Sequence, residues 1–449
     1  MNNPKKCQCR IWVDIGGELK GKSYDNRQCP RFKVDGDFCK SHNIEENRCF
    51  GLISEPRPEE PYKKGSRHYW SYQTKPLKKV NKVKKVKNVN KKDNKMKAIS
   101  LFSGMGGDSL GIVNAGLDLV AYSEWEKEMR DTHELNFPNT KLLGCGDIIK
   151  TKDEEFLKYK GIVDLIFAGF PCTGFSKAGS QNSDDPRNAL YKEFIRATNN
   201  IKPKYIIGEN VKGILKMKNP EGNLFIDVIK NEFDKIGYDI SCKVYMCSKL
   251  DIGVPQNRER IILVGIRKDL NQVFSFPEEN EERSGNLKNI VKFTMEGALK
   301  IEPDDLDFDF NDIPEECILT DMDNDESDNN PHPNLVQYAK KRDYTRKGVD
   351  RPHRLHFGRR LDVGGEIIDI RKPINTIICS FAYCPRFFIP QKNKNGNYLR
   401  CPTPDEYKQF QGFPADYQIS GDTGKKIKQI GNAVPPPLIE MIIKELVKY

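Results

Sequence analysis

The sequence has no long run of apolar residues and no secretion signal. None of its apolar stretches approaches the roughly 20 residues that a helix needs to cross a bilayer. Residues 1–6 lack the apolar core of a signal peptide. These absences argue against a membrane-spanning or exported protein, so we expect an intracellular one, cytoplasmic or nuclear. The 13 cysteines are then expected to be thiols and metal ligands, because disulfides are rare in reducing compartments.

Two nucleotide-binding fingerprints are also missing. A predicted strand, 98–102, leads into a glycine-rich turn, 103–107, and then into a predicted helix over 108–115. This order is typical of a nucleotide-type site, where bare backbone meets a ligand at a helix N-terminus. The turn lacks the G-x-G-x-x-G spacing and no Walker lysine follows it, which argues against dinucleotide and triphosphate ligands.

The chain is long, highly charged and basic. Its 449 residues suffice for two or three domains. Charged residues make up 31% of the chain and the mean hydropathy is −0.68, as in a heavily solvated protein. The formal net charge is +10, although acidic residues crowd into 302–328. The basic excess favours a polyanionic partner through counterion release, but many basic proteins bind no nucleic acid.

The N-terminal residues 1–62 are predicted to form a small zinc-binding module. Cysteine and histidine concentrate there, and Cys39 and His42 form a C-x-x-H pair. The segment has too few apolar residues for a core of its own, which favours a metal as the stabilising element. Cys9 and Cys49 remain alternative ligands, and a tail of unrelated thiols is the alternative interpretation. The predicted tetrahedral zinc ligands are Cys7, Cys29, Cys39 and His42.

Residues 63–97 are predicted to be a basic linker. From 75 to 97 the sequence is mostly Lys, Val and Asn, with no helical or strand period. Such a segment is either a solvated tether, a nonspecific phosphate binder or a nuclear address.

Acidic residues follow the next two predicted strand units. A strand over 117–122 ends at Glu124 and Trp125, and a third unit ends at Asp147 and Ile148. An acid after the second strand of a doubly wound fold is placed to hold ribose hydroxyls, and the tryptophan could stack on a base. Alternatively, Glu124 is a helix-start carboxylate and Asp147 an N-cap.

The chain is organised around Cys172, which follows Pro171 at the end of a predicted strand over 162–168. Open α/β sheets place their chemistry outside the carboxyl ends of the strands, and proline fixes the direction of the loop. The alternative is a small buried cysteine that packs as a hydrophobe.

The rest of the chain completes an α/β fold. Predicted helices (187–197, 224–236) alternate with predicted strands (204–208, 241–247, 261–266), so 98–267 should form one parallel-type sheet flanked by helices. Glu209 should then follow the end of its strand. Residues 268–424 are predicted to be a smaller irregular domain with a partly disordered acidic insertion, 304–330. Residues 425–449, with a helix over 438–447, should return to the sheet domain of 98–267.

Together these segments resemble the cytosine-C5 methyltransferase family, over 98 to the C-terminus. The motifs occur in the family's order: Leu-Phe-Ser-Gly-Met-Gly-Gly at 101–107, Gly-Phe-Pro-Cys at 169–172, Glu-Asn-Val at 209–211, Gln-x-Arg-x-Arg at 256–260, and Gly-Asn-Ala-Val-Pro-Pro at 431–436. Thr-Pro-x-Glu at 403–406 and Gln-Gly-Phe-Pro at 411–414 also fit. Two positions depart from the family: Ser100 stands where many members carry Asp, and Thr173 replaces the common Gln.

The resemblance implies a Rossmann-like methyltransferase sheet, a target-recognition region in 268–424, and methyl transfer from S-adenosylmethionine to cytosine C5 in double-stranded DNA, with the target base flipped out. It implies Cys172 as the nucleophile that adds to C6, Glu209 as the group that binds N3 and the amine, Arg260 as the contact to O2 and Arg258 as a support for nearby charge. We expect a monomer that meets no membrane. By resemblance the cofactor-binding residues are Phe102, Ser103, Gly104, Gly106, Glu124, Trp125, Asp147, Ile148, Pro171, Leu190 and Asn432.

Two alternative functions remain open at this point. One is C5 methylation of cytosine in RNA, especially tRNA. The long insertion and the basic linker favour DNA over RNA. The other is an inactive DNA-binding homologue, against which the presence of Cys172, Glu209 and Arg260 argues. An ion pair with Glu259 or another sheet-edge carboxylate is the structural alternative for the two arginines.

Overall fold

The chain forms two compact units, Met1–Lys92 and Asp93–Tyr449. The computed structural model describes residues 95–171, 189–219, 221–251, 253–280, 285–303, 305–306, 308–327, 330–339, 355–358 and 365–448, together with four two-residue strands. Of the first unit it describes only β1 (Arg10–Ile11) and β2 (Arg27–Gln28), which pair antiparallel with Arg10 opposite Gln28. The four predicted zinc ligands and the basic linker up to residue 94 lie outside the described residues.

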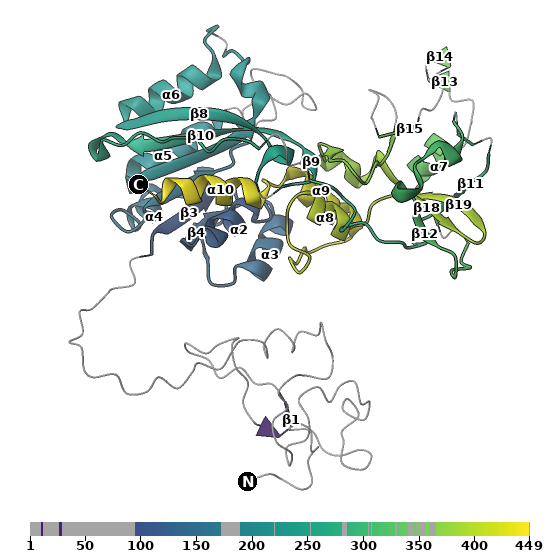
Figure 1. Cartoon of the computed structure of the whole chain (residues 1–449). Helices are drawn as coiled ribbons and strands as arrows, with labels where there is room; N and C mark the ends of the chain where they lie inside the picture. The colour runs from purple at the N-terminus through teal and green to yellow at the C-terminus, as the bar shows by residue number, and fades with distance from the viewer. Residues whose placement is uncertain are drawn as a thin grey trace, which may run out of the picture. The chain divides into compact units, whose positions relative to one another are not determined.

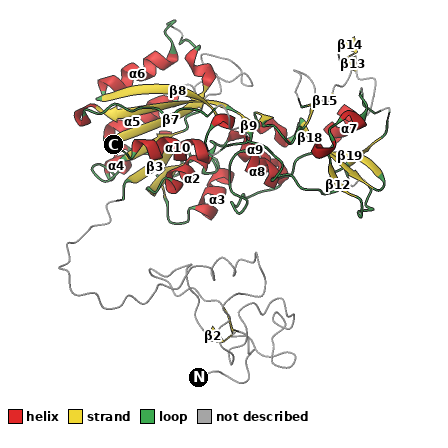
Figure 2. Cartoon of the chain, viewed as in Figure 1, coloured by secondary structure: helices red, strands yellow, loops and turns green. Residues whose placement is uncertain are grey.

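A seven-stranded sheet is the centre of the second unit (Figures 1 and 2). Its strand order is β5-β4-β3-β6-β7-β10-β8, and the first five of these strands run parallel. The chain leaves the central β3 outward to β4 and β5, then returns to β6 on the other side of β3. The strands are β3 (Lys97–Leu101), β4 (Asp118–Ser123), β5 (Lys141–Leu142), β6 (Leu165–Ala168), β7 (Tyr205–Val211), β8 (Tyr238–Met246) and β10 (Glu259–Arg267).

Helices cover both faces of this sheet, which explains why its central strands are almost uniformly apolar. One apolar core joins the sheet to α4, α5 and α6, and a second joins it to α2 and α10. In Figure 1 the C-terminal α10 lies beside α2, from the opposite end of this unit. The helices are α2 (Gly107–Asn114), α3 (Lys127–Asn136), α4 (Asp153–Leu157), α5 (Tyr191–Ile201), α6 (Phe225–Lys235) and α10 (Pro436–Leu446).

The sheet is not purely parallel, so the predicted parallel-type sheet is wrong at one edge. β10 lies between β7 and β8 and runs antiparallel to both. A parallel connection requires a crossover, usually a helix. The described residues between β8 and β10 form only η6 (Cys247–Lys249) and β9 (Gln256–Asn257), so the chain turns back instead.

A second sheet forms the smaller lobe, which corrects the prediction of an irregular domain. Five strands run in the order β11-β19-β18-β16-β15, and β12 pairs with β18. The β18–β19 hairpin turns at Lys394-Asn395, and Gly396, paired with Asn393, begins β19. The elements are β11 (Leu299–Ile301), β12 (Leu319–Asp321), α7 (Pro333–Ala339), β15 (Leu355–Phe357), β16 (Gly365–Ile367), β18 (Phe387–Asn393) and β19 (Gly396–Arg400), with a separate pair β13 (Thr345–Arg346) and β14 (Val349–Asp350).

The acidic insertion, predicted to be partly disordered, contains regular structure in its described residues. It contains η8 (Phe310–Asp312), η9 (Glu315–Cys317) and β12. Phe310, Ile313 and Cys317 are buried in the core of the smaller lobe, and this apolar spacing anchors the acidic chain.

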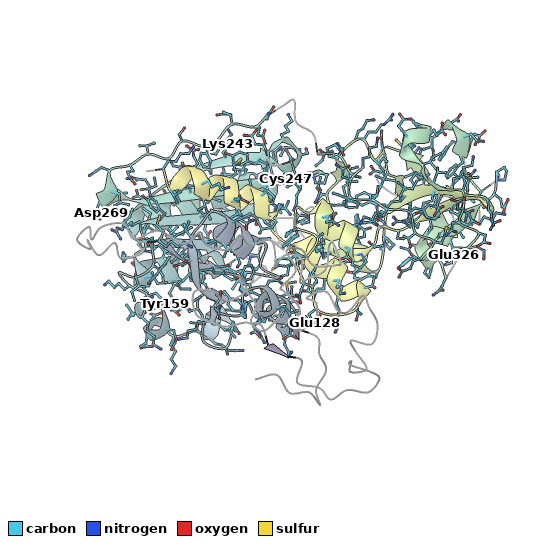
Figure 3. All side chains as sticks on the ribbon, turned by 60° about the horizontal axis from the view of Figure 1, so that its bottom comes forward. Glu128, Tyr159, Lys243, Cys247, Asp269 and Glu326 are labelled. Carbon is cyan, nitrogen blue, oxygen red and sulfur yellow. The ribbon has the colours of Figure 1, made fainter. Side chains whose placement is uncertain are left out.

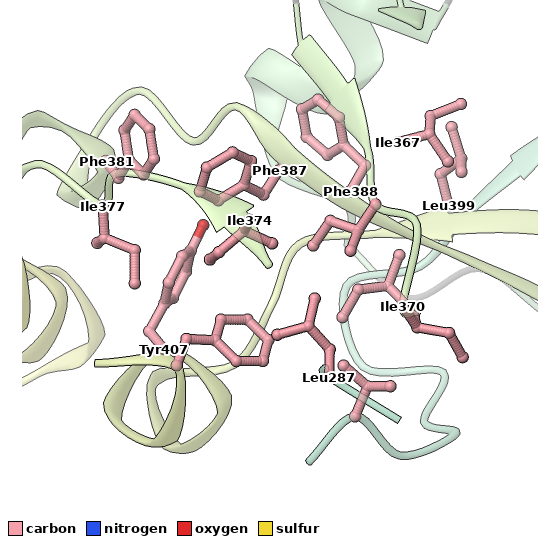
Figure 4. Close-up of a cluster of buried hydrophobic side chains, with 14 of the residues drawn as sticks. Leu287, Ile367, Ile370, Ile374, Ile377, Phe381, Phe387, Phe388, Leu399 and Tyr407 are labelled. Atoms are coloured by element: carbon pink, nitrogen blue, oxygen red, sulfur yellow. The ribbon is translucent and has the colours of Figure 1, made fainter. Parts of the chain in front are cut away.

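Helices from the last part of the chain join the two lobes. α8 (Pro404–Phe410) and α9 (Thr423–Asn432) lie between the sheets in Figure 1, and α9 packs on η10 (Cys379–Ala382). β17 (Ile374–Asn375) pairs with β9. Figure 4 shows Tyr407 of α8 among apolar side chains of the smaller lobe, including Phe381 and Phe387. None of the helices in the described residues combines the length and apolarity that crossing a bilayer requires.

Candidate active site

Two loops meet where the strand order reverses. The glycine-rich loop follows β3 and the loop of Pro171 follows β6, and these two strands are neighbours in the sheet. Doubly wound sheets bind their ligands in the crevice at this switch point. The fold therefore places both predicted motifs at the position where such proteins carry their sites.

The glycine-rich loop has an unusual backbone. Phe102 has a φ of 58°, although it carries a side chain, and Gly104 and Gly106 follow with φ values of 55° and 93°. A residue other than glycine in this region is disfavoured by about 1–3 kcal/mol, so surrounding contacts must impose the conformation. The amide of Ser103 donates to the carbonyl of Ser123 over 2.9 Å, which holds the loop against the end of β4.

Glu124 fixes the far side of this loop. Its Oε2 accepts from the amide of Gly104 at 2.9 Å and its Oε1 accepts from the amide of Glu126 at 2.7 Å, just before α3. The carboxylate is thus also the helix-start group that the alternative interpretation expected. Burial raises its pKa. Each oxygen has a second lone pair, so the carboxylate can still accept hydrogen bonds from a diol.

The adjoining Trp125 is 70% exposed, whereas Glu124 is 7% exposed. Arg130 fixes this turn by donating to the carbonyls of both residues, at 2.6 and 3.0 Å. A large aromatic face in solvent beside a buried acid is an arrangement that suits a ligand with a planar base and a ribose.

The second predicted acid, Asp147, is an N-cap. The side chain of Asp147 accepts from the amide of Ile149 at 3.1 Å and pairs with Lys150 at 3.0 Å. Ile148 is buried in the core. Asp147 is therefore the N-cap that the alternative interpretation expected. A cofactor contact at this position would use the remaining lone pairs of its carboxylate.

The loop after β6 is fastened from the neighbouring strand. The side-chain amide of Asn210 donates to the carbonyl of Phe170 at 3.2 Å, and Asn210 is itself buried. Pro171 follows, partly exposed. Cys172 lies outside the described residues. Asn210 therefore fixes the backbone two residues before the predicted nucleophile, a role that the sequence motif alone did not indicate.

Glu209 and Arg260 form an ion pair at the end of β7 nearest this loop. Arg260 Nε lies 2.7 Å from Glu209 Oε1, and both side chains are only 10–12% exposed. Glu209 lies within β7 rather than after it, which corrects the predicted strand end at residue 208. The strand is longer because β10 continues to pair with it as far as Val211, opposite Arg260. This register makes Glu209 and Arg260 diagonal neighbours.

Arg258 performs a different task from Arg260. It is buried and donates to the carbonyls of Ile377 (2.8 Å), Gly431 (3.1 Å) and Ala433 (3.2 Å). It thereby holds the segment before β10 against η10 and the end of α9. The side chain of Glu259 pairs with Lys212.

Leu190 and Asn432 complete the described part of the predicted cofactor set. Leu190 precedes α5 and is partly buried, and Asn432 is the exposed last residue of α9. The cofactor-binding roles of Leu190 and Asn432 stay predictions.

A second thiol lies close to the ion pair. Cys247, labelled in Figure 3, is a buried residue of the larger lobe. Burial raises its pKa to about 12, despite the nearby guanidinium groups of Arg260 and Arg258. Its thiol is therefore neutral near pH 7 and unsuited to nucleophilic attack.

The sheet, the switch-point loops and the buried acid–guanidinium pair define a Rossmann-like methyltransferase. The family model for C-5 cytosine-specific DNA methylase matches residues 96–448, so the chain belongs to that family. Membership implies S-adenosylmethionine as the methyl donor.

Among curated relatives, the chain is similar to the type II methyltransferase M.FnuDI of Fusobacterium nucleatum, 41% identical over 207 residues, which are 45% of this chain and 57% of that protein. It is 30% identical to M1.HphI of Haemophilus parahaemolyticus over 363 residues, 78% and 86% of the two chains. The first two curated relatives are thus each matched over less than two thirds of their length.

Among solved structures, a variant of DNMT2 from Spodoptera frugiperda matches with a TM-score of 0.52 and 19% identity, over 78% of this chain and 99% of that chain. At this identity the match shows the shared fold.

Proposed function

We propose that this protein transfers a methyl group from S-adenosylmethionine to C5 of cytosine in double-stranded DNA. Family membership supports the proposal, and the observation that carries it is the Glu209–Arg260 pair beside the Pro171 loop. Cytosine presents an acceptor at O2, an acceptor at N3 and an amine donor along one edge. A carboxyl group beside a guanidinium matches that edge.

Cytosine C5 is too weak a nucleophile to react unaided, so Cys172 is proposed to activate it. The thiolate adds to C6 and places electron density on C5. C5 would then take the methyl group as the S–CH3 bond of the donor breaks, leaving S-adenosylhomocysteine. Loss of the C5 proton to solvent and expulsion of the Cys172 thiolate would restore the ring. Asn210 holds the nucleophile loop during these steps through the carbonyl of Phe170.

Glu209 and Arg260 are proposed to bind the base while the thiolate adds. Glu209 shares a proton with N3 and accepts from the exocyclic amine, and Arg260 donates to O2. Their ion pair uses one carboxylate oxygen, and a carboxylate has about four lone pairs, so acceptor capacity for the base remains. The three carbonyl contacts of Arg258 support a positioning role for that residue.

Residues around the glycine-rich loop are proposed to bind S-adenosylmethionine. When bound, S-adenosylmethionine supplies an electrophilic methyl group. Glu124 would accept from the ribose hydroxyls and Trp125 would stack on the adenine. The positive-φ backbone of 102–106 allows close approach. The remaining proposed contacts are Ser103, Asp147, Ile148, Pro171, Leu190 and Asn432.

Residues 268–424 are proposed to recognise the DNA, and the target base to leave the duplex, because a stacked cytosine cannot reach a pocket at the switch point. A DNA substrate would place the activity inside the cell.

The proposal is tested by supplying the protein with S-adenosylmethionine and either duplex DNA or tRNA, followed by bisulfite sequencing. We expect 5-methylcytosine in the duplex at a fixed sequence context. Methylation of tRNA alone would assign the RNA activity instead, and methylation of neither would indicate an inactive DNA-binding homologue.

We also propose that residues 1–62 bind one zinc ion through Cys7, Cys29, Cys39 and His42. Support comes from the C-x-x-H spacing and from the β1–β2 pair, which joins Arg10 to Gln28, one residue before Cys29. The described residues elsewhere hold no group of three or more metal-ligating side chains. Metal analysis of freshly purified protein should find about one zinc per chain, and a substitution of Cys39 by Ser should lower that content. Metal-free wild-type protein would contradict the proposal.

A further inference from the structure

A buried carboxyl group lies directly behind the glycine-rich loop. Asp108, in the first turn of α2, is 1% exposed. Its Oδ2 accepts a hydrogen bond from the hydroxyl of Ser100 in β3, and that hydroxyl also contacts the hydroxyl of Ser103. A continuous chain of hydrogen bonds thus joins the start of α2, the end of β3 and the loop.

Ser103 is the residue that this chain of hydrogen bonds holds. It lies between Phe102 and Gly104, both of which have positive φ values, of 58° and 55°. Its own amide is bound to the carbonyl of Ser123. The loop is therefore fixed at Ser103 on both sides, while Glu124 fixes Gly104.

No cationic side chain pairs with Asp108 within the described part of the chain. Ser100 comes from β3, Ser109 from the same helix lies 3.5 Å from Oδ2, and Tyr417 comes from the segment between α8 and α9. His133 of α3 bonds Ser109 at 2.9 Å, and burial lowers its pKa to about 3, so it is neutral. Burial raises the pKa of Asp108 to about 7. A buried carboxyl group in such surroundings must be satisfied by hydrogen bonds.

We infer that Asp108 is a positioning residue for the methyl donor. Through Ser100 and Ser103 it holds the 102–104 backbone in the conformation that the donor meets. The inference rests on the proposed donor site.

The test measures binding of S-adenosylmethionine by titration calorimetry, with no DNA present, in full-length variants. Asp108→Ala and Ser100→Ala should weaken binding about five- to tenfold, the equivalent of one or two buried hydrogen bonds. Asp108→Asn keeps an acceptor for Ser100 and should bind almost as the wild type does. The exchange Ser100→Asp with Asp108→Ser restores a carboxyl–hydroxyl pair in reverse order and should recover most of the affinity lost in Asp108→Ala.

The matched control is Ser241→Ala, which removes a strand hydroxyl bonded to the carbonyl of Val264 at 3.4 Å in the same sheet. It should leave donor affinity unchanged. In turnover assays, Ser100→Ala should raise KM for the donor and leave the KM for DNA and the donor-saturated kcat near wild type.

Wild-type affinity in both Asp108→Ala and Ser100→Ala would overturn the inference while leaving the proposed function intact. The inference would also be overturned if the exchanged double variant bound S-adenosylmethionine as weakly as Asp108→Ala does, with both variants folded by circular dichroism. If Asp108→Ala fails to fold, Ser100→Ala alone decides. A wild-type protein that binds no donor would instead refute the proposed function.

Discussion

At the scale of single residues, the two arginines Arg258 and Arg260 have different partners. Arg260 pairs with Glu209, whereas Arg258 donates hydrogen bonds to three backbone carbonyls. Both belong to one Gln-x-Arg-x-Arg motif, and the motif alone assigned both to the chemistry. The partners of Arg258 at 431 and 433 are more than 170 residues distant in sequence, so local pattern does not reveal them.

Glu209→Gln should lower kcat by about 10²- to 10⁴-fold, because the amide cannot exchange a proton with N3. The affinity for S-adenosylmethionine should remain within about twofold, since Glu209 is proposed to touch the base and not the donor. Single-turnover rates and calorimetry give the two quantities. Glu154→Gln, an exposed position in α4, is the control. A kcat near wild type would remove Glu209 from the catalytic set.

Asp108 should give the folded protein a measurable pH dependence. Its pKa is 3.8 in the unfolded chain and about 7 when buried. Between these pH values the folded state holds one proton more, so stability is lost as the pH rises from about 4 to 7. Asp108→Asn lacks this titration, so its free energy of unfolding relative to wild type should increase over that window by up to about 4 kcal/mol. Urea unfolding at several pH values measures it, and parallel profiles would contradict the burial.

At the scale of elements, the helices and strands that carry the motifs were largely predictable. The alternation of apolar strands and amphipathic helices located β3, β4, β6 and α5 to within a few residues. The antiparallel β10 was not, because an apolar run carries no sign of its direction. The smaller sheet was missed since its strands are short and interrupted.

The contact between α2 and α10 depends on Gly111. A Cβ there would lie 2.7 Å from Ile439 Cβ and 2.7 Å from the carbonyl oxygen of Pro436. Gly111→Ala should therefore destabilise the protein by about 1–3 kcal/mol through overpacking. Gly424→Ala in α9 is the matched control, because its Cβ would meet no heavy atom closer than 3.5 Å; it should be neutral or slightly stabilising. Equal urea midpoints for the two variants would contradict the close packing.

At the scale of the whole molecule, the segment between α8 and α9 connects the smaller lobe with the glycine-rich loop. Tyr417 donates from this segment to the carbonyl of Met105. Lys428 of α9 pairs with Glu126 at 2.8 Å, just after the Glu124–Trp125 turn. Motif order along the sequence indicated the family, but these cross-lobe contacts arise from the fold. They explain how residues beyond 400 come to support a loop near residue 104.

The most direct test of the central claim is covalent trapping on a DNA duplex that carries 5-fluorocytosine at the target position, with S-adenosylmethionine present. Fluorine replaces the hydrogen that C5 must lose as a proton in the last step. The ring therefore cannot expel the thiolate, which remains attached to C6. We predict a denaturant-resistant protein–DNA adduct for the wild type and for Cys145→Ser, an exposed thiol, and none for Cys172→Ser. An adduct that survives Cys172→Ser, or that never forms while the unmodified duplex is methylated, would contradict the account.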